Sequence, residues 1–268
     1  MSAADFESVA CEASHAAGRV LRRRFRETGP LKIESKGLHD FVTEVDREAE
    51  DAVLSYIRQR YPDHGIMSEE DSPEVVHHGM RWVVDPLDGT TNFIHGVCPF
   101  SVSVALEDDD GLVAGVIHDP FHEETFHAHR GGGARLNGEP ISCSQEVDND
   151  QAVVATGFPF RELERLPQYM KSFEAVVRST AGIRRAGSAA IDLAYTACGR
   201  YDAFWEVGLS RWDIAAGTLL VQEAGGIVTD IAGDNRMLDS GDIVAGGKAL
   251  HGFMLGVTRE AFGGAPPR

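Results

Sequence analysis

A short segment in the first half of the chain carries two aspartates that are close enough to share one ligand. Asp85 ends the apolar run 82–84, and Pro86 directs the chain into a turn, so that Asp88 can converge on the same point. The carbonyl group of Leu87, between the two aspartates, offers a third hard oxygen atom. Oxygen ligands of this kind are those that Mg²⁺ prefers. The segment therefore predicts a magnesium site.

The three residues that follow add a possible anion site. Gly89, Thr90 and Thr91 would begin a short helix, where outward-facing backbone N–H groups attract negative charge. A cation site beside an anion site suits a phosphate group bridged by metal ions. Asp-Pro and Asp-Gly are also common turn dipeptides, so an ordinary turn remains the alternative at this point.

Acidic residues recur in three other places. Glu69 lies in an acidic run after a short apolar stretch. Asp46 follows Thr43 by three residues at the start of a predicted helix, a spacing that also fits a helix capping box. Asp213 lies in the first turn of another predicted helix, where the helix dipole stabilises a carboxylate. Taken alone, each cluster has a structural explanation as well as a functional one.

Hydrophobic periodicity predicts the elements that position these motifs. In the first half, helices over 5–26 and 44–60 precede strands at 81–84, 100–106, 112–117 and 124–129. In the second half, strands alternate with helices. The strands are predicted at 153–156, 201–207, 227–229 and 243–245, and the helices over 166–177 and from about Ser188, Trp212 and Lys248.

This pattern predicts a layered α+β fold, an αβαβα sandwich. N-terminal helices pack on a largely antiparallel sheet, and the C-terminal half is α/β. The polar stretch 143–150 has no periodicity and suggests a division into an N-terminal α+β subdomain, 1–146, and a C-terminal α/β subdomain, 147–268. The first subdomain would supply most metal ligands, and the second would supply Glu206 and Asp213.

The charge balance restricts the possible partners. The 42 acidic residues outnumber the 25 basic ones and give a net charge of −17, which weighs against direct binding of nucleic acid. Bound cations could supply the local positive charge that an anionic substrate needs. No apolar run approaches the roughly 20 residues that cross a bilayer, and the N-terminal stretch 1–20 carries acids instead of a signal peptide's bases. We expect a cytoplasmic protein without membrane contact.

Two of these motifs resemble the signature motifs of the inositol monophosphatase family. They are Asp85-Pro-Leu-Asp88-Gly-Thr90-Thr-Asn-Phe93 and Trp212-Asp213-x-Ala-Ala-Gly. The acids at 40–46 and 69–70, and the stretch 187–190, fall where that family has its remaining motifs. The match runs from about Lys36 to Gly247, and its pattern looks like the bacterial branch. The resemblance implies a metal-dependent, lithium-sensitive phosphatase that hydrolyses myo-inositol monophosphate or a similar polyol monophosphate.

The resemblance also implies a set of metal ligands. Glu69, Asp85 and the Leu87 carbonyl would hold one Mg²⁺, and Asp85, Asp88 and Asp213 a second, with Asp85 bridging the two. A weaker third ion would rest on Glu69 and water, so that two to three ions are expected per site. Clustered carboxylates raise one another's pKa, and divalent cations would neutralise them.

Catalytic and substrate-binding roles follow from the same resemblance. Thr90 and Glu69 would orient the attacking water, and Asp46 would support Thr90. The amides of Gly89 and Thr90 would bind the phosphate group. Attack would be in line and without a phosphoenzyme, because no Cys, Ser or His lies in a recognisable phosphate-cradling loop. The alcohol half of the substrate is assigned to Asp88, Gly187, Ser188, Ala189, Glu206 and Asp213.

The substrate is less well determined than the reaction. Glu206 suits a neutral polyol and would repel a second phosphate group. Histidinol phosphate, fructose bisphosphate and a 3′-phosphoadenosine nucleotide remain alternatives. A nucleotide would require an aromatic or cationic wall, and the sequence pattern does not identify one.

A role as a transcription-machinery partner, with vestigial or secondary phosphatase activity, is an alternative of another class. Arg161, Arg184 and Arg185 would then form the contact surface. A homodimer is expected from the resemblance and from the frequency of closed homo-oligomers. His127 and His129 share one strand face, but nothing else in the sequence joins them, so we expect a surface pair and no metal site.

Overall fold

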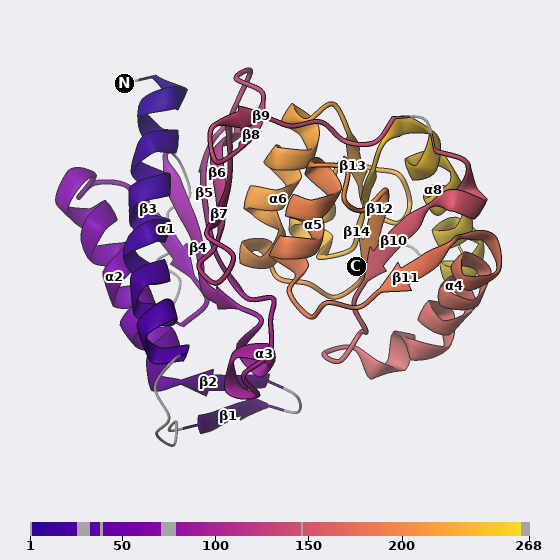
Figure 1. Cartoon of the computed structure of the whole chain (residues 1–268), viewed down its shortest axis with the longest axis horizontal. Helices are drawn as coiled ribbons and strands as arrows, with labels where there is room; N and C mark the ends of the chain where they lie inside the picture. The colour runs from indigo at the N-terminus through magenta and orange to yellow at the C-terminus, as the bar shows by residue number, and fades with distance from the viewer. Residues whose placement is uncertain (1, 26–32, 38–39, 71–78, 146, 264–268) are drawn as a thin grey trace.

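Five layers of secondary structure alternate along the long axis of the molecule (Figure 1). The computed structural model describes residues 2–25, 33–37, 40–70, 79–145 and 147–263. The outer layers are helical, and a pair of helices separates two β-sheets. In order, the helices are α1 (Ala3–Phe25) and α2 (Glu44–Arg60), then α5 (Ala189–Ala197) and α6 (Arg211–Glu223), then α4 (Leu166–Ser179) and α8 (Lys248–Phe262). The predicted αβαβα sandwich is confirmed.

The first sheet has seven strands in the order β3-β4-β5-β6-β7-β8-β9. The strands are β3 (Gly65–Ser68), β4 (Arg81–Asp88), β5 (Ser101–Asp108), β6 (Gly111–Asp119), β7 (Glu124–His129), β8 (Ala134–Leu136) and β9 (Glu139–Pro140). Only β3 and β4 pair in parallel; the other neighbours are antiparallel. The largely antiparallel sheet is therefore as predicted, although β3, β8 and β9 are too short to give a periodic signal.

The second sheet has five strands in the order β11-β10-β12-β14-β13. The strands are β10 (Val153–Thr156), β11 (Gly182–Arg184), β12 (Ala203–Glu206), β13 (Ile227–Thr229) and β14 (Ile243–Gly246). β10 runs parallel to both β11 and β12, whereas β14 is antiparallel to its two neighbours. Parallel neighbours end at the same edge of a sheet, and this arrangement positions part of the site described below.

The burial of each helix reflects its layer. α1 buries one stripe of mostly small residues against the first sheet, as an amphipathic outer helix does. α5 and α6 are buried on nearly every side, because a sheet lies against each face of their layer. Gly217 in α6 allows this close packing, since a Cβ atom there would lie 2.5 Å from the side chain of Leu193 in α5.

The remaining elements are short. They are the hairpin strands β1 (Ile33–Gly37) and β2 (Asp40–Thr43), the helices α3 (Thr90–Ile94) and α7 (Met237–Ser240), and the 3₁₀ turns Asn149–Gln151 and Leu163–Arg165. None of the helices among the described residues is both long and apolar enough to cross a bilayer. The division of the chain at 146/147 stays a prediction.

One expectation from the sequence needs correction. His127 and His129 are joined by a third group, Glu7 of α1, whose two carboxylate oxygens lie 2.6 and 2.5 Å from the Nδ1 atoms of the two rings. Glu7 is far from β7 in the sequence, and only the packing of α1 on the sheet brings them together. The histidines therefore tie a helix to the sheet.

Candidate active site

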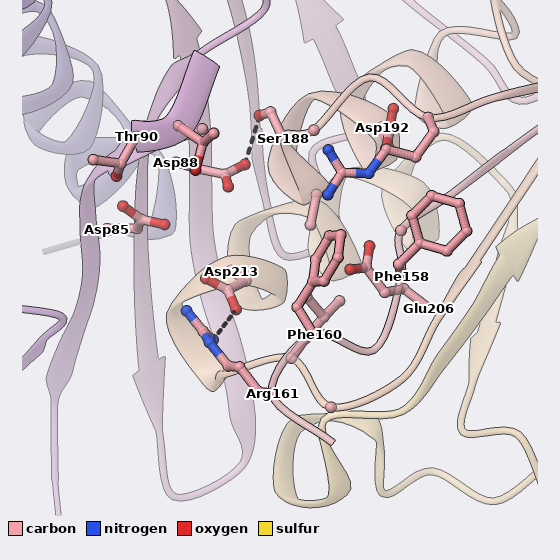
Figure 2. A pocket seen from close by; sticks show the side chains of 18 of the residues that line it. Asp85, Asp88, Thr90, Phe158, Phe160, Arg161, Ser188, Asp192, Glu206 and Asp213 are labelled. Atoms are coloured by element: carbon pink, nitrogen blue, oxygen red, sulfur yellow. Dashed lines mark hydrogen bonds and ion pairs between the residues drawn. The ribbon is translucent and has the colours of Figure 1, made fainter. Parts of the chain in front are cut away.

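A cavity of about 320 Å³ lies at the junction of the two halves. Every predicted site residue except Asp46 lines it. Figure 2 shows Asp85, Asp88 and Thr90 on one side of the cavity, Phe158, Asp192 and Glu206 on the other, and Asp213 between them. The acidic side is built by the end of β4, and the opposite side by the end of β12, the chain after β10 and the start of α5.

Three aspartates form a compact oxygen cluster on the acidic side. Asp85, Asp88 and Asp213 each offer one carboxylate oxygen, and these oxygens all lie within 4.8 Å of one another. The pairing of β4 with β5 shifts register between Asp85 and Asp88, and the Leu87 N–H donates to Asp85 Oδ1 over 2.9 Å. This local irregularity allows both carboxylates to face one point. Glu69 lines the same cavity beside Asp85 but is not part of the three-oxygen cluster.

Asp88 is held by the opposite half of the chain. The Ser188 hydroxyl donates to Asp88 Oδ2 over 2.5 Å, and the Ala190 N–H donates to the same oxygen over 2.8 Å. Both donors belong to the N-terminus of α5, where Ser188 is the N-cap. Unpaired N–H groups at a helix start favour a carboxylate. Asp88 and the 187–190 stretch, both assigned to the alcohol half of the substrate, are thus in direct contact.

Asp213 is oriented within its own helix. The Ser210 N–H donates to Asp213 Oδ2 over 2.7 Å, and Arg161 Nη1 lies 3.4 Å from the same oxygen. Asp213 is 6% exposed, so its carboxylate meets solvent mainly through the cavity. The position in the first turn of α6 agrees with the prediction from the sequence.

Burial and mutual repulsion perturb this cluster. Burial raises the pKa of Asp85 well above its usual range, and the charges of Glu69, Asp88 and Asp213 add to the effect. Burial and Asp213 raise the pKa of Asp88 to about 7, although Ser188 and the α5 amides oppose the rise. Carboxylates this close are ionised together only when positive charge neutralises them. Carboxylate oxygens beside a backbone carbonyl fit a hard divalent cation.

These shifts make stability depend on pH when no cation is bound. Between the unfolded pKa of an aspartate, near 4, and about 7, folded Asp88 binds more protons than the unfolded chain does. Stability therefore falls as pH rises through this window. We expect the Tm of the metal-free protein to drop by about 5 °C or more from pH 5 to pH 8. Thermal denaturation with chelator should show a smaller drop in Tm between pH 5 and pH 8 for Asp88→Asn than for the unaltered protein. Equal drops in the two proteins would contradict the raised pKa of Asp88.

Asp46 reaches the cavity through Thr90. The Thr90 hydroxyl lies 3.1 Å from Asp46 Oδ1 and 3.0 Å from the Leu87 carbonyl oxygen. The other Asp46 oxygen accepts from the Thr43 N–H over 2.8 Å and from the Thr43 hydroxyl over 2.5 Å. One Asp46 oxygen therefore serves the capping box and the other contacts Thr90. That Asp46 supports Thr90 in catalysis stays a prediction. Burial raises the pKa of Asp46, and these hydrogen bonds oppose the rise.

Gly89 occupies a position that other residues would strain. Its φ is 95°, in the left-handed region, and an added Cβ would lie 3.1 Å from the Pro99 carbonyl oxygen. Thr90 then begins the short helix α3. That the amides of Gly89 and Thr90 bind phosphate stays a prediction.

Glu206 defines the opposite end of the cavity. It ends β12, and burial and Asp213 raise its pKa to about 8, whereas Arg185 and Arg161 oppose the rise. Its carboxylate lies against the backbone of Gly157, where a Cβ would come within 2.0 Å of Glu206 Oε1. Gly157 therefore lines the cavity at a position that the sequence did not indicate.

An aromatic and cationic wall at this end was also missed. The Arg185 guanidinium carbon lies 5.8 Å from the ring centroid of Phe158 and 5.3 Å from that of Phe160. Arg161 lines the cavity too. The order of the strands explains why the segment after β10 lines the cavity. β10 and β12 are parallel neighbours, and Thr156 pairs with Trp205. The residues that follow Thr156 therefore lie beside Glu206, at the same end of the two strands.

Comparison with known proteins is consistent with this geometry. The model of the inositol monophosphatase family matches residues 3–261. A Pseudomonas aeruginosa protein named Nus factor SuhB is 48% identical over 89% of this chain and 90% of its own length. An inositol-1-monophosphatase of Mesorhizobium japonicum is 41% identical over 94% of this chain and 96% of its own. The crystal structure of the extragenic suppressor protein SuhB from Bartonella henselae superposes with a TM-score of 0.91 at 40% identity, covering 94% and 98% of the two chains.

Proposed function

Because the chain belongs to the inositol monophosphatase family and is a phosphoric monoester hydrolase, we propose that it hydrolyses the monophosphate ester of a small polyol, such as myo-inositol. One observation carries the proposal. Three carboxylate oxygens suited to a divalent cation face a cavity whose far end holds Glu206. A phosphate-release screen over a panel of monoesters with Mg²⁺ tests it, and polyol monophosphates should give the highest kcat/KM.

The family is metal-dependent, and we propose Mg²⁺ as the cation, with two to three ions per site. Asp85, Asp88 and Asp213 would hold it, with Glu69 and the Leu87 carbonyl completing the ligands. The ions would neutralise the acidic cluster, lower the pKa of a water molecule and stabilise the charge that develops on the phosphate oxygens.

The side chains around the cluster would position the reactants. The Thr90 hydroxyl, fixed between Asp46 and the Leu87 carbonyl, can accept a hydrogen bond from the attacking water while it donates its own hydrogen bond to Asp46. Glu69 would accept a second hydrogen bond from that water. The backbone N–H groups of Gly89 and Thr90 would bind the phosphate oxygens. Each of these groups acts by position and charge, and none forms a covalent bond to phosphorus.

Replacement of Glu206 by Gln tests how the alcohol is recognised. Arg161 and Arg185 favour the ionised form of Glu206, and cations that neutralise Asp213 would favour it further. A charge-assisted hydrogen bond contributes about 1.5–3 kcal/mol, so kcat/KM for polyol monophosphates should fall roughly tenfold to a hundredfold. The kcat/KM for p-nitrophenyl phosphate, which lacks ring hydroxyls, should change little. A parallel loss on both substrates, or a loss of metal affinity, would show that Glu206 is a structural or metal-binding residue.

Other phosphate esters remain candidates because of the aromatic and cationic wall at the Glu206 end of the cavity. Phe158, Phe160 and Arg185 could stack a nucleotide base, and two guanidinium groups could accept a second phosphate group. The screen should therefore include histidinol phosphate, fructose bisphosphate and a 3′-phosphoadenosine nucleotide. Preference for one of these would replace the polyol as the proposed substrate.

A second role in transcription is proposed from the relatives that are named Nus factor SuhB. Three arginines were first considered for such a contact. Two of them, Arg161 and Arg185, line the cavity, so a partner that binds them would also cover the active site. An Asp88→Asn variant separates the two roles: a cellular function that survives the loss of hydrolysis would be non-catalytic. We also propose a cytoplasmic homodimer, whose mass light scattering at micromolar concentration checks.

A further inference from the structure

One buried carboxyl group at the far end of the cavity has no role in the reaction described above. Asp192 lies in α5, in the helical layer between the two sheets, and is 1% exposed. Its Oδ1 atom has no hydrogen-bond partner among the described residues. The residue nevertheless lines the cavity. An unpartnered polar group in an interior is costly, by about 1–3 kcal/mol, and calls for an explanation.

The position of Asp192 relates it to the residues that surround the substrate. It follows Ser188 by four residues, so both lie on the same face of α5, and Ser188 contacts Asp88. At the other side, Glu206 is close enough that its charge adds to burial in raising the pKa of Asp192. Figure 2 shows Asp192 and Glu206 on the side of the cavity opposite Asp85. The buried Asp192 and the half-buried Glu206 therefore both face the space where the alcohol half would lie.

The charges nearby restrict what these carboxyl groups can bind. Arg185 lowers the pKa of both Asp192 and Glu206, and Arg161 acts on Glu206 as well. Two guanidinium groups at the same end offset the charge of the carboxyl groups, so a cationic alcohol gains little net attraction there. A neutral group that donates hydrogen bonds, such as a hydroxyl, satisfies the carboxyl oxygens without added charge.

We propose that Asp192 is a second specificity-determining residue, which accepts a hydrogen bond from a substrate hydroxyl other than the one that Glu206 contacts. This rests on the proposed function and narrows it. The preferred alcohol carries at least two free hydroxyls placed to reach two carboxyl groups, as a cyclic polyol does. The Asp192 carboxyl group lines the cavity and lacks a full set of hydrogen-bond partners, and a substrate hydroxyl would supply one.

The test compares Asp192→Ala and Asp192→Asn with the unaltered enzyme on three kinds of substrate. These are myo-inositol 1-phosphate, a set of its monodeoxy analogues, and p-nitrophenyl phosphate. Asp192→Ala should lower kcat/KM for the inositol ester by roughly tenfold to a hundredfold and leave p-nitrophenyl phosphate within about twofold. One deoxy analogue should be hydrolysed equally well by Asp192→Ala and by the unaltered enzyme, because this analogue lacks the hydroxyl that Asp192 binds. Asp192→Asn retains an acceptor and should fall between.

Stability separates this role from a structural one. Asp192→Asn keeps the size of the side chain and removes a buried ionisable group, so it should hold or raise the Tm. The matched control is Asp230, a buried aspartate outside the cavity whose Oδ1 accepts from the Ala232 and Asp234 N–H groups, both over 2.9 Å. Asp230→Ala should lower the Tm and leave the ratio between the two substrates unchanged.

The outcomes distinguish the inference from the proposed function. If Asp192→Ala depresses inositol 1-phosphate and p-nitrophenyl phosphate equally, or if no deoxy analogue loses its sensitivity to Asp192, the inference is wrong and the polyol assignment stands. If the unaltered enzyme releases no phosphate from any polyol monophosphate, the proposed function fails, and the inference fails with it.

Discussion

Replacement of Asp85 by Asn should lower kcat/KM by more than about a hundredfold on every substrate. Asp85 is 1% exposed and lies at the centre of the acidic group, where Glu69, Asp88 and Asp213 all act on its pKa. An amide of the same size keeps the fold but removes the charge that would be shared between two cations. Steady-state kinetics over a range of Mg²⁺ concentrations should show both a low kcat and a weaker response to the metal.

A matched control comes from Asp119, which is also fully buried in the first half of the chain. Its Oδ1 atom accepts from the Phe121 N–H and the His122 N–H, over 2.9 and 3.0 Å, and it does not line the cavity. Asp119→Asn should keep nearly full activity. If Asp85→Asn is as active as this control, Asp85 does not hold the catalytic cation.

Removal of divalent cations should abolish hydrolysis. A chelator should lower the rate by about a thousandfold or more, because both the activation of water and the stabilisation of phosphate charge are lost together. Added Mg²⁺ should restore the rate and raise the Tm, since it binds the folded chain alone. Full activity in excess chelator would exclude the mechanism. The family resemblance further implies that Li⁺ and excess Mg²⁺ inhibit.

The elements that the sequence predicts well are those with a clear apolar pattern. The helix predicted over 44–60 has those bounds in the structure, and the strands at 124–129 and 153–156 are likewise as expected. The hairpin of β1 and β2 and the short strand β3 were not predicted. A run of four or five residues indicates a strand when it is mostly apolar, as 153–156 is, and these three segments are neither mostly apolar nor regularly alternating.

The site divides in the same way. Asp85 and Asp88 are visible from local spacing, whereas the distant Asp213 joins them only through the resemblance to a family motif. Asp192 reads as a helical position in an apolar run, and its lack of a partner is a property of the packed layer. The wall of Phe158 and Arg185 depends on sheet order, which one sequence does not specify.

The hydrogen bonds from Ser188 and Ala190 to Asp88 have a thermodynamic consequence for the whole chain. The proposed cation site takes Asp85 and Asp88 from the first sheet and Asp213 from α6, and Asp88 is oriented by α5. Neither half contains a complete site, so cation affinity and the docking of the halves are linked functions. Each tenfold rise in free cation above its Kd then adds about 1.4 kcal/mol to that docking. Binding of the proposed catalytic cation would thus also stabilise the packing of the two halves against each other.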